Sequence, residues 1–93
     1  MEPKARLHLI ITGRVQGVFF RLKAEEKARQ LGLVGSAKNN QAGNVEIMAE
    51  GEVAKLKELY AWCHHGSDLA RVEKIYEKWL DYQDEFKDFN VVS

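Results

Sequence analysis

The segment from Gly13 to Arg21 has the residue types of an anion-binding loop, Gly-Arg-Val-Gln-Gly-Val-Phe-Phe-Arg. Where such a loop leads into a helix, it can direct successive backbone N–H groups toward one point and hold an anion there. Gly17 supplies backbone freedom for the turn and lets a ligand approach the main chain closely. Arg21 can donate two parallel hydrogen bonds to a phosphate, which lysine does not reproduce. From the spacing alone, two solvent-exposed arginines beside a turn are an equally good interpretation.

Other chemistries have weaker support in the sequence. Cys63, His64 and His65 are adjacent, and neighbouring residues of a helix point about 100° apart, so they cannot converge on a metal ion. His8 alternates with apolar residues and is expected on a partly covered strand face, where it is not a catalytic base. The sequence has no Ser-His-Asp grouping and no nucleophile elbow.

The elements on either side of the loop follow from hydrophobic periodicity. Residues 6–12 alternate as a strand does, and Gly13 is expected to end that strand. Residues 21–31 are good helix formers, and Gly32 is a natural helix stop. The expected apolar stripe of this helix consists of Phe20, Ala24, Ala28 and Leu31. The loop is therefore predicted to connect a strand to a helix.

The middle of the chain predicts a hairpin and a second helix. Residues 33–38 and 45–50 are short strand candidates around Asn39-Asn40-Gln41-Ala42-Gly43-Asn44, a stretch whose residues tolerate positive φ. On this pattern alone, an asparagine at a strand end is most often a turn former. Apolar residues then recur at helical spacing from Val53 to about His65.

The last third leaves one element open. Residues 72–82 fit a helical stripe, while their β-branched and aromatic side chains favour a strand. Residues 86–92 predict a short closing strand. If the open segment is a strand, the order is βαββαβ plus a C-terminal strand, which is the ferredoxin-like split βαβ sandwich with two helices on one face of an antiparallel sheet. Because many unrelated functions use this α+β scaffold, it does not settle the activity.

Two motifs resemble signatures of the acylphosphatase family. The first, G-R-V-Q-G-V-x-F-R, is complete from Gly13 to Arg21, with Phe19 in the variable position. The second is matched by Gly35, Ala37, Lys38, Asn39, Gly43, Val45 and Gly51. One position differs, because Ser36 stands where the family usually has an aromatic residue that packs beside the active-site strand. Residues 69–73 and Trp79 also look like family features, so the resemblance spans nearly the whole chain and implies that residues 72–82 form a strand.

The resemblance also implies a reaction and a set of site residues. It implies a hydrolase acting on acid anhydrides, which converts a small-molecule acyl phosphate to carboxylate and inorganic phosphate without a cofactor or metal. Arg21 would bind the phosphoryl group, and Asn39 would position the attacking water. The phosphate-binding loop would be Val15, Gln16, Gly17, Val18, Phe19 and Phe20. All of these contacts go to the phosphoryl end of the substrate, so low selectivity for the acyl group is expected.

Size and charge limit the remaining possibilities. The 93 residues are expected to form a single domain, residues 1–93, with one modest core. Because 14 basic residues balance 14 acidic ones, we expect no nucleic-acid or membrane partner, and a monomer that binds phosphate or another oxyanion locally. The short apolar run near the start and the lone cysteine, Cys63, favour the cytoplasm.

Two alternatives use the same loop and arginine. One is a non-catalytic binding module of ferredoxin-like fold that senses a phosphate-bearing metabolite. The other is a domain like the acylphosphatase-like domain of hydrogenase-maturation proteins, against which the absence of a further domain in the sequence argues. Asn39 separates catalysis from sensing, because a sensor does not need a group that positions water.

Overall fold

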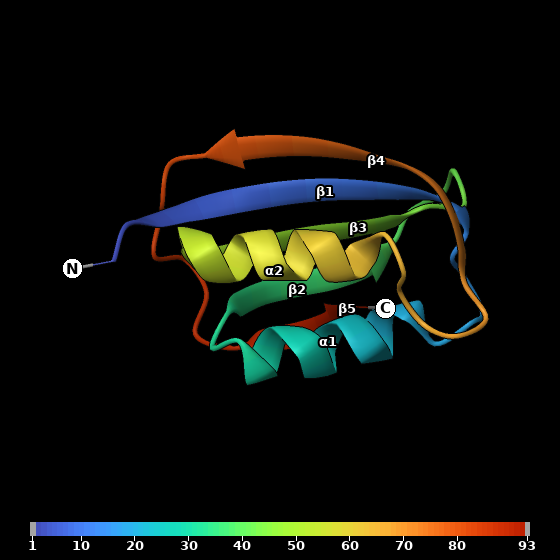
Figure 1. Ribbon diagram of the computed structural model, residues 1–93, viewed down its shortest axis with the longest axis horizontal. Coiled ribbons are helices and arrows are strands. Elements are labelled where there is room, and N and C mark those ends of the chain that lie inside the picture. The colour runs from blue at the N-terminus through green and yellow to red at the C-terminus, as the bar shows by residue number, and fades with distance from the viewer. Residues whose placement is uncertain (1, 93) are drawn as a thin grey trace.

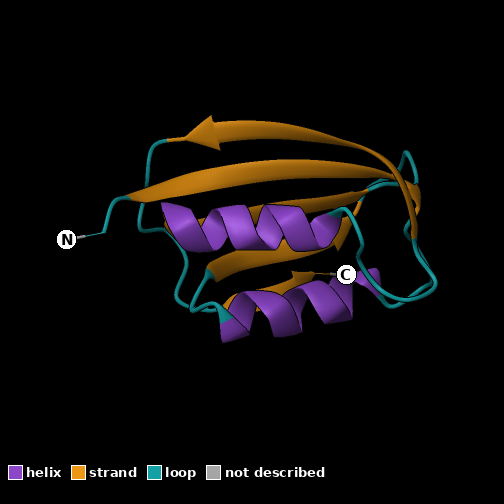
Figure 2. Cartoon of the chain, in the orientation of Figure 1, coloured by secondary structure: helices purple, strands orange, loops and turns teal. Residues whose placement is uncertain are grey.

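The computed structural model describes residues 2–92, which form five strands and two helices (Figure 1). In chain order they are β1 (Lys4–Arg14), α1 (Phe20–Gln30), β2 (Val34–Asn39), β3 (Val45–Glu52), α2 (Val53–Cys63), β4 (Arg71–Leu80) and β5 (Phe89–Val92). The strands form one sheet in the order β4-β1-β3-β2-β5. Both helices cover the same face of this sheet (Figure 2). The predicted ferredoxin-like sandwich is confirmed.

The core lies between the sheet and the two helices. Alternate residues of β1, namely Leu7, Leu9 and Ile11, are fully buried because strand side chains alternate between the two faces. Helix α2 lies over β1 and β3, and α1 lies over β2 and β5. The rings of Phe20 and Trp62 join the two helices with centroids 5.4 Å apart. Each fully buried leucine or phenylalanine contributes about 1.5–3 kcal/mol of hydrophobic stabilisation.

Strand β1 extends past the position where the sequence predicted its end. Gly13 lies within the strand, at a shift of register between Thr12 and Gly13 in the pairing with β4. Its φ is +117°, and a Cβ at this position would lie 2.1 Å from the carbonyl oxygen of Arg71. A glycine is therefore required because β4 approaches too closely for any side chain. The bulge lies one residue before β1 ends at Arg14, where the chain enters the loop.

The open segment is strand β4, as the family resemblance implied. Within residues 2–92 it pairs only with β1, and it forms one edge of the sheet. Trp79 is paired with the buried Leu7 on the helix-covered face but packs only partly on this edge strand, where it is 39% exposed. Tyr76 lies on the helix-free face and is 54% exposed. Their helix-like spacing reflects this incomplete burial and does not reflect a helical stripe.

The closing strand differs from the prediction in two respects. It begins at Phe89 and not at residue 86, and it pairs with β2 in parallel. The sheet is therefore mixed and not entirely antiparallel. Parallel pairing follows because residues 81–88 carry the chain back along the sheet before β5 begins.

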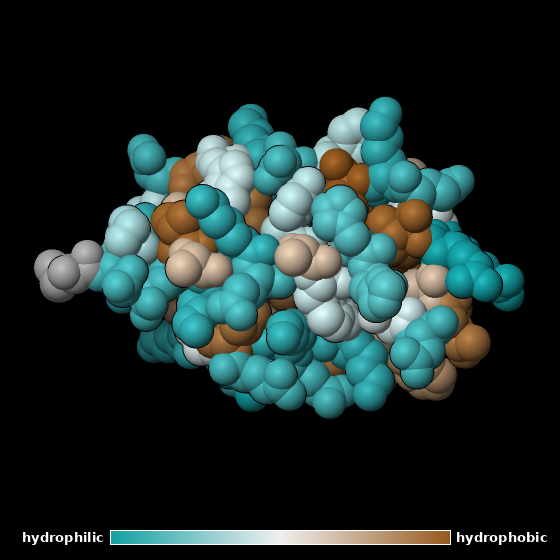
Figure 3. Space-filling view, viewed as in Figure 1, coloured by the Kyte–Doolittle hydropathy of each residue, from teal (hydrophilic) through white to brown (hydrophobic). Residues whose placement is uncertain are grey.

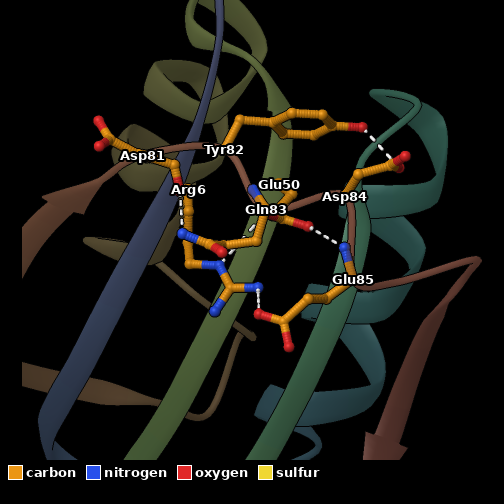
Figure 4. A network of polar contacts seen from close by, with 7 residues as sticks. All are labelled: Arg6, Glu50, Asp81, Tyr82, Gln83, Asp84 and Glu85. Atoms are coloured by element: carbon orange, nitrogen blue, oxygen red, sulfur yellow. Dashed lines mark hydrogen bonds and ion pairs between the residues drawn. The ribbon is translucent and has the colours of Figure 1, made fainter.

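A buried carboxylate holds this connection in place (Figure 4). Glu50 of β3 is fully buried and accepts hydrogen bonds from the backbone N–H groups of Gln83, at 2.6 Å, and Glu85, at 3.1 Å. Arg6 donates to the same carboxylate at 3.2 Å and also pairs with the Glu85 side chain. Burial alone raises the pKa of Glu50, but the two backbone donors and Arg6 outweigh it and lower the pKa below its ordinary value.

Candidate active site

The loop between β1 and α1 is anchored by its side chains and leaves its backbone available. Val15, Val18 and Phe20 are buried, whereas Phe19 points outward. Gly17 and Phe19 both adopt left-handed backbone conformations, with φ values of 73° and 64°. These alternating turns fold the loop tightly before α1 begins at Phe20.

The amides of this loop are free to bind a ligand. Among residues 2–92, no backbone or side-chain acceptor is bonded to the N–H groups of residues 15–20. The Ser67 hydroxyl donates to the Val18 carbonyl in the interior. Because the peptide between Val18 and Phe19 is planar and trans, its N–H must point the opposite way, out of the core. The positive end of the α1 dipole adds to the attraction for an anion.

Gln16 ties the loop to the β2–β3 hairpin. Its side-chain amide donates to the carbonyl oxygens of Asn40, at 3.1 Å, and Asn44, at 2.9 Å. This contact could not be predicted from the sequence, because any residue type supplies a carbonyl. Two side chains, Gln16 and Ser67, therefore hold the loop from two other segments of the chain.

Asn40, the neighbour of the predicted Asn39, organises the hairpin turn. Its side-chain oxygen accepts from the N–H groups of Ala42 and Asn44, each at 3.0 Å. Its amide nitrogen donates to Glu46 at 3.1 Å, and His8 contacts the other oxygen of Glu46 at 3.2 Å. The hydrogen bonds from Asn40 and then His8 lower the pKa of Glu46 below its ordinary value. This network fixes the turn that Gln16 contacts.

Arg21 lies where the sequence predicted, in the first turn of α1. Its Nη1 atom donates to the carbonyl oxygen of Val92 at 2.9 Å. The arginine lines a hollow together with Val15, Gly17, Phe19, Phe20, Leu22 and Val91. Gln16 and Val18 of the predicted loop do not line this hollow, since the first reaches the hairpin and the second is buried.

Asn39 is the last residue of β2, and its side-chain oxygen is buried without a hydrogen-bond partner among residues 2–92. It is two residues beyond the buried Ala37, so both side chains lie on the helix-covered face. Lys38 pairs with Val92, the residue that Arg21 contacts, which brings Asn39 and Arg21 to the same end of the sheet. Asn39 does not line the hollow beside Arg21. An orphaned buried acceptor is rare and indicates a place for water or ligand.

The remaining candidates lie outside this arrangement. Ser36 is on the helix-free face, opposite to Asn39, beside a surface hollow that Met48 and Phe86 also line. Cys63 is fully buried at the end of α2, and burial raises the pKa of its thiol. Residues 2–92 contain no group of three or more histidine, cysteine or carboxylate side chains arranged to hold a metal ion. Over the same residues, no helix is long and apolar enough to cross a membrane.

Comparison with known proteins identifies the family. A family model described as Acylphosphatase matches residues 7–91. The chain belongs to the acylphosphatase family. A curated acylphosphatase from Marinobacter nauticus is 48% identical over 84 residues, which cover 90% of this chain and 91% of that protein. The family resemblance predicted from the two motifs is confirmed.

Solved acylphosphatase structures share the fold over nearly the whole chain. One from Coxiella burnetii is 34% identical with a TM-score of 0.91, covering 97% of this chain and 94% of that one. One from Bacillus subtilis is 31% identical with a TM-score of 0.92, covering 96% of this chain and 99% of that one. The protein is therefore an acylphosphatase, an enzyme that hydrolyses the carboxyl-phosphate bond of small-molecule acyl phosphates.

Proposed function

We propose that Arg21 and the amides of residues 15–20 bind the phosphoryl group and that Asn39 holds the attacking water. The proposal rests on one observation: hydrogen-bond donors without an acceptor and a buried acceptor without a donor lie at the same end of the sheet. The loop amides have no acceptor, and the buried Asn39 oxygen has no donor, among residues 2–92. Folded proteins seldom leave such groups without partners except where a ligand or water supplies them.

The chemistry needs positioning more than a strong nucleophile. An acyl phosphate is a reactive mixed anhydride, and its carboxylate is a good leaving group. Water held by Asn39 attacks phosphorus, the bond from phosphorus to the bridging oxygen breaks, and the carboxylate departs with that electron pair. Arg21 and the loop amides stabilise the charge that redistributes over the phosphoryl oxygens. A carboxamide is too weak a base to take the water proton, so a phosphate oxygen accepts it.

The proposal also includes the domain organisation, oligomeric state, location and cofactor requirement of the enzyme. We infer that residues 1–93 act as one domain and as a cytoplasmic monomer, without a metal, a cofactor, nucleic acid or a membrane. The even balance of 14 basic and 14 acidic residues and the lone, buried Cys63 support this. A non-catalytic binding module would use Arg21 without needing Asn39, but the family to which the chain belongs is a family of hydrolases.

Substitution of Arg21 tests the assignment of the phosphoryl site. With a chelator present throughout, Arg21→Ala is expected to lower kcat/KM for benzoyl phosphate by at least about 10³-fold, because substrate binding and charge stabilisation are both lost. Lys23→Ala is the matched control, since it removes an exposed cation from the same helix and should change kcat/KM by less than about twofold. Near-normal hydrolysis by Arg21→Ala would contradict the proposal.

A further inference from the structure

The hollow beside Arg21 has an apolar rim to which the proposed mechanism gives no role. Phe19 is 66% exposed and Leu22 is 50% exposed, and both side chains line the hollow. Val91 of β5 also lines it. Single exposed apolar residues are common on protein surfaces, but here two of them, from a loop and a helix, line one hollow with Arg21 and the half-buried Val91 of β5. Figure 3 shows hydrophobic surface at the end of the molecule where the loop before α1 lies.

The backbone of Phe19 is unusual for its residue type. Its φ of 64° is in the left-handed region, which bulky side chains rarely adopt. This conformation turns the ring outward between Val18 and Phe20, which are both buried. Strained conformations persist where the surroundings enforce them and concentrate at functional sites. Burial in the protein core does not explain the strain, because the ring stays in solvent.

The position of the rim relative to the phosphoryl group suggests its use. Leu22 is in the first turn of α1 and Phe19 immediately precedes the helix, and both line the hollow that Arg21 also lines. In an acyl phosphate only the bridging oxygen separates phosphorus from the acyl carbon. A phosphoryl group at Arg21 therefore places the acyl substituent against the rim of the same hollow, where apolar surface is removed from water on both partners.

We propose that Phe19, Leu22 and Val91 form a subsite for the acyl group, so that the enzyme favours acyl phosphates with aromatic or extended aliphatic acyl groups over acetyl phosphate. This inference rests on the proposed phosphoryl-binding role of Arg21. It replaces the low selectivity that the sequence predicted, because the rim gives the acyl end of the substrate its own contacts.

Relative substrate preference tests the subsite. The ratio of kcat/KM for benzoyl phosphate to that for acetyl phosphate is expected to fall by roughly fivefold or more in Leu22→Gln and in Phe19→Asn. Asparagine tolerates a positive φ, and the ratio removes any general loss of activity caused by a change in the loop backbone. Tyr76→Ser is the control, because it removes an exposed ring on the helix-free face and should leave the ratio unchanged. Ratios within about twofold of the wild type in both rim variants would overturn the subsite.

A binding measurement separates failure of the subsite from failure of the proposed mechanism. Titration calorimetry with phenylphosphonate and methylphosphonate reports affinity without turnover. Tighter binding of phenylphosphonate that Leu22→Gln abolishes supports the subsite, even if a site-residue assignment is wrong. Equal affinities for the two phosphonates in the wild type and both rim variants overturn the subsite, even if Arg21→Ala shows that the phosphoryl site is correct.

Discussion

The two polar clusters at opposite ends of β1 differ in how completely their groups are paired. At the start of β1, the Glu50 carboxylate is buried and receives two backbone N–H groups and the Arg6 guanidinium (Figure 4). Toward the other end of β1, level with Ile11 across β3, the Asn39 side-chain oxygen is also buried, but it has no partner among residues 2–92. Both clusters bury polar atoms, and only the first satisfies them.

This difference in hydrogen bonding indicates that the Glu50 cluster contributes to stability and that the Asn39 end of the sheet contributes to function. A buried carboxylate with three donors ties β1, β3 and the segment before β5 together, so its loss should unfold the protein more easily. An acceptor without a partner gives the folded state no such stabilisation, and its loss should affect only what binds there. The comparison therefore predicts opposite consequences for substitutions in the two clusters.

The largest effect is expected for Asn39→Ala, which should lower kcat by about 10²–10³-fold while KM stays within about threefold. The water loses its positioning group, while no hydrogen bond within residues 2–92 is lost, so the melting temperature should not fall. Steady-state kinetics and thermal unfolding on one preparation measure both. Asn40→Ala is the matched control, since it removes three hydrogen bonds of the hairpin turn and should lower the melting temperature. A large loss of stability in Asn39→Ala would break the contrast.

Glu50→Gln should give the opposite result, with stability reduced by about 3 kcal/mol and kcat unchanged. The new amide group would place a donor against a backbone N–H, and Arg6 would lose its buried counter-charge. Chemical denaturation gives the unfolding free energy, and the acyl phosphate assay gives kcat. Glu85→Gln is the control, because its side chain is 58% exposed and its ion pair should contribute less than about 1 kcal/mol. A Glu50→Gln protein as stable as the wild type would remove the basis of the comparison.

The contribution of Glu50 should also be measurable in the pH dependence of the unfolding free energy. Because the folded state lowers the pKa of Glu50 below the ordinary value of 4.5, its contribution is fully present above that pH. The contribution is lost as the pH falls through the lower, folded pKa. Unfolding free energies measured from about pH 7 to about pH 3 should therefore decline less steeply for Glu50→Gln than for the wild type. Parallel pH profiles would show that another group, such as Glu46, dominates the acid response.

The smallest effect is expected for Gln16→Ala, which frees the loop from the hairpin. Both carbonyls that Gln16 contacts keep another backbone donor, so the stability should fall by only about 1 kcal/mol. A less ordered loop should raise KM for acyl phosphates by roughly three- to tenfold while kcat changes less. Gln30→Ala, at the exposed end of α1, is the control for glutamine loss. An unchanged KM would show that the buried side chains alone fix the loop.

The sequence predicted the features that depend on local pattern. The alternation in residues 6–12 and the stripe of Phe20, Ala24 and Ala28 identified β1 and α1, since burial follows the period of each element. Periodicity could not decide residues 72–82, because an edge strand buries too little of either face to show a clear period of two. There the family resemblance succeeded where the pattern did not.

Features that depend on distant backbone groups could not be predicted. The partners of Glu50 are N–H groups 33 and 35 residues away, and those of Gln16 are carbonyls 24 and 28 residues away. Any residue type provides such groups, so no side-chain pattern marks them. The exposure of Phe19 could not be predicted for a different reason. An aromatic residue between two apolar neighbours predicts burial, and the outward direction of this side chain depends on one backbone angle.

The bond from Arg21 to Val92 spans 71 residues and has a consequence for biosynthesis. A ribosome adds the arginine 71 residues before it adds the carbonyl group that the arginine contacts. A nascent polypeptide that still lacks β5 has neither the parallel edge of its sheet nor the acceptor for the guanidinium. The enzyme can therefore acquire its ordered arginine only after translation has passed residue 92, so incomplete chains carry the motif without the assembled site.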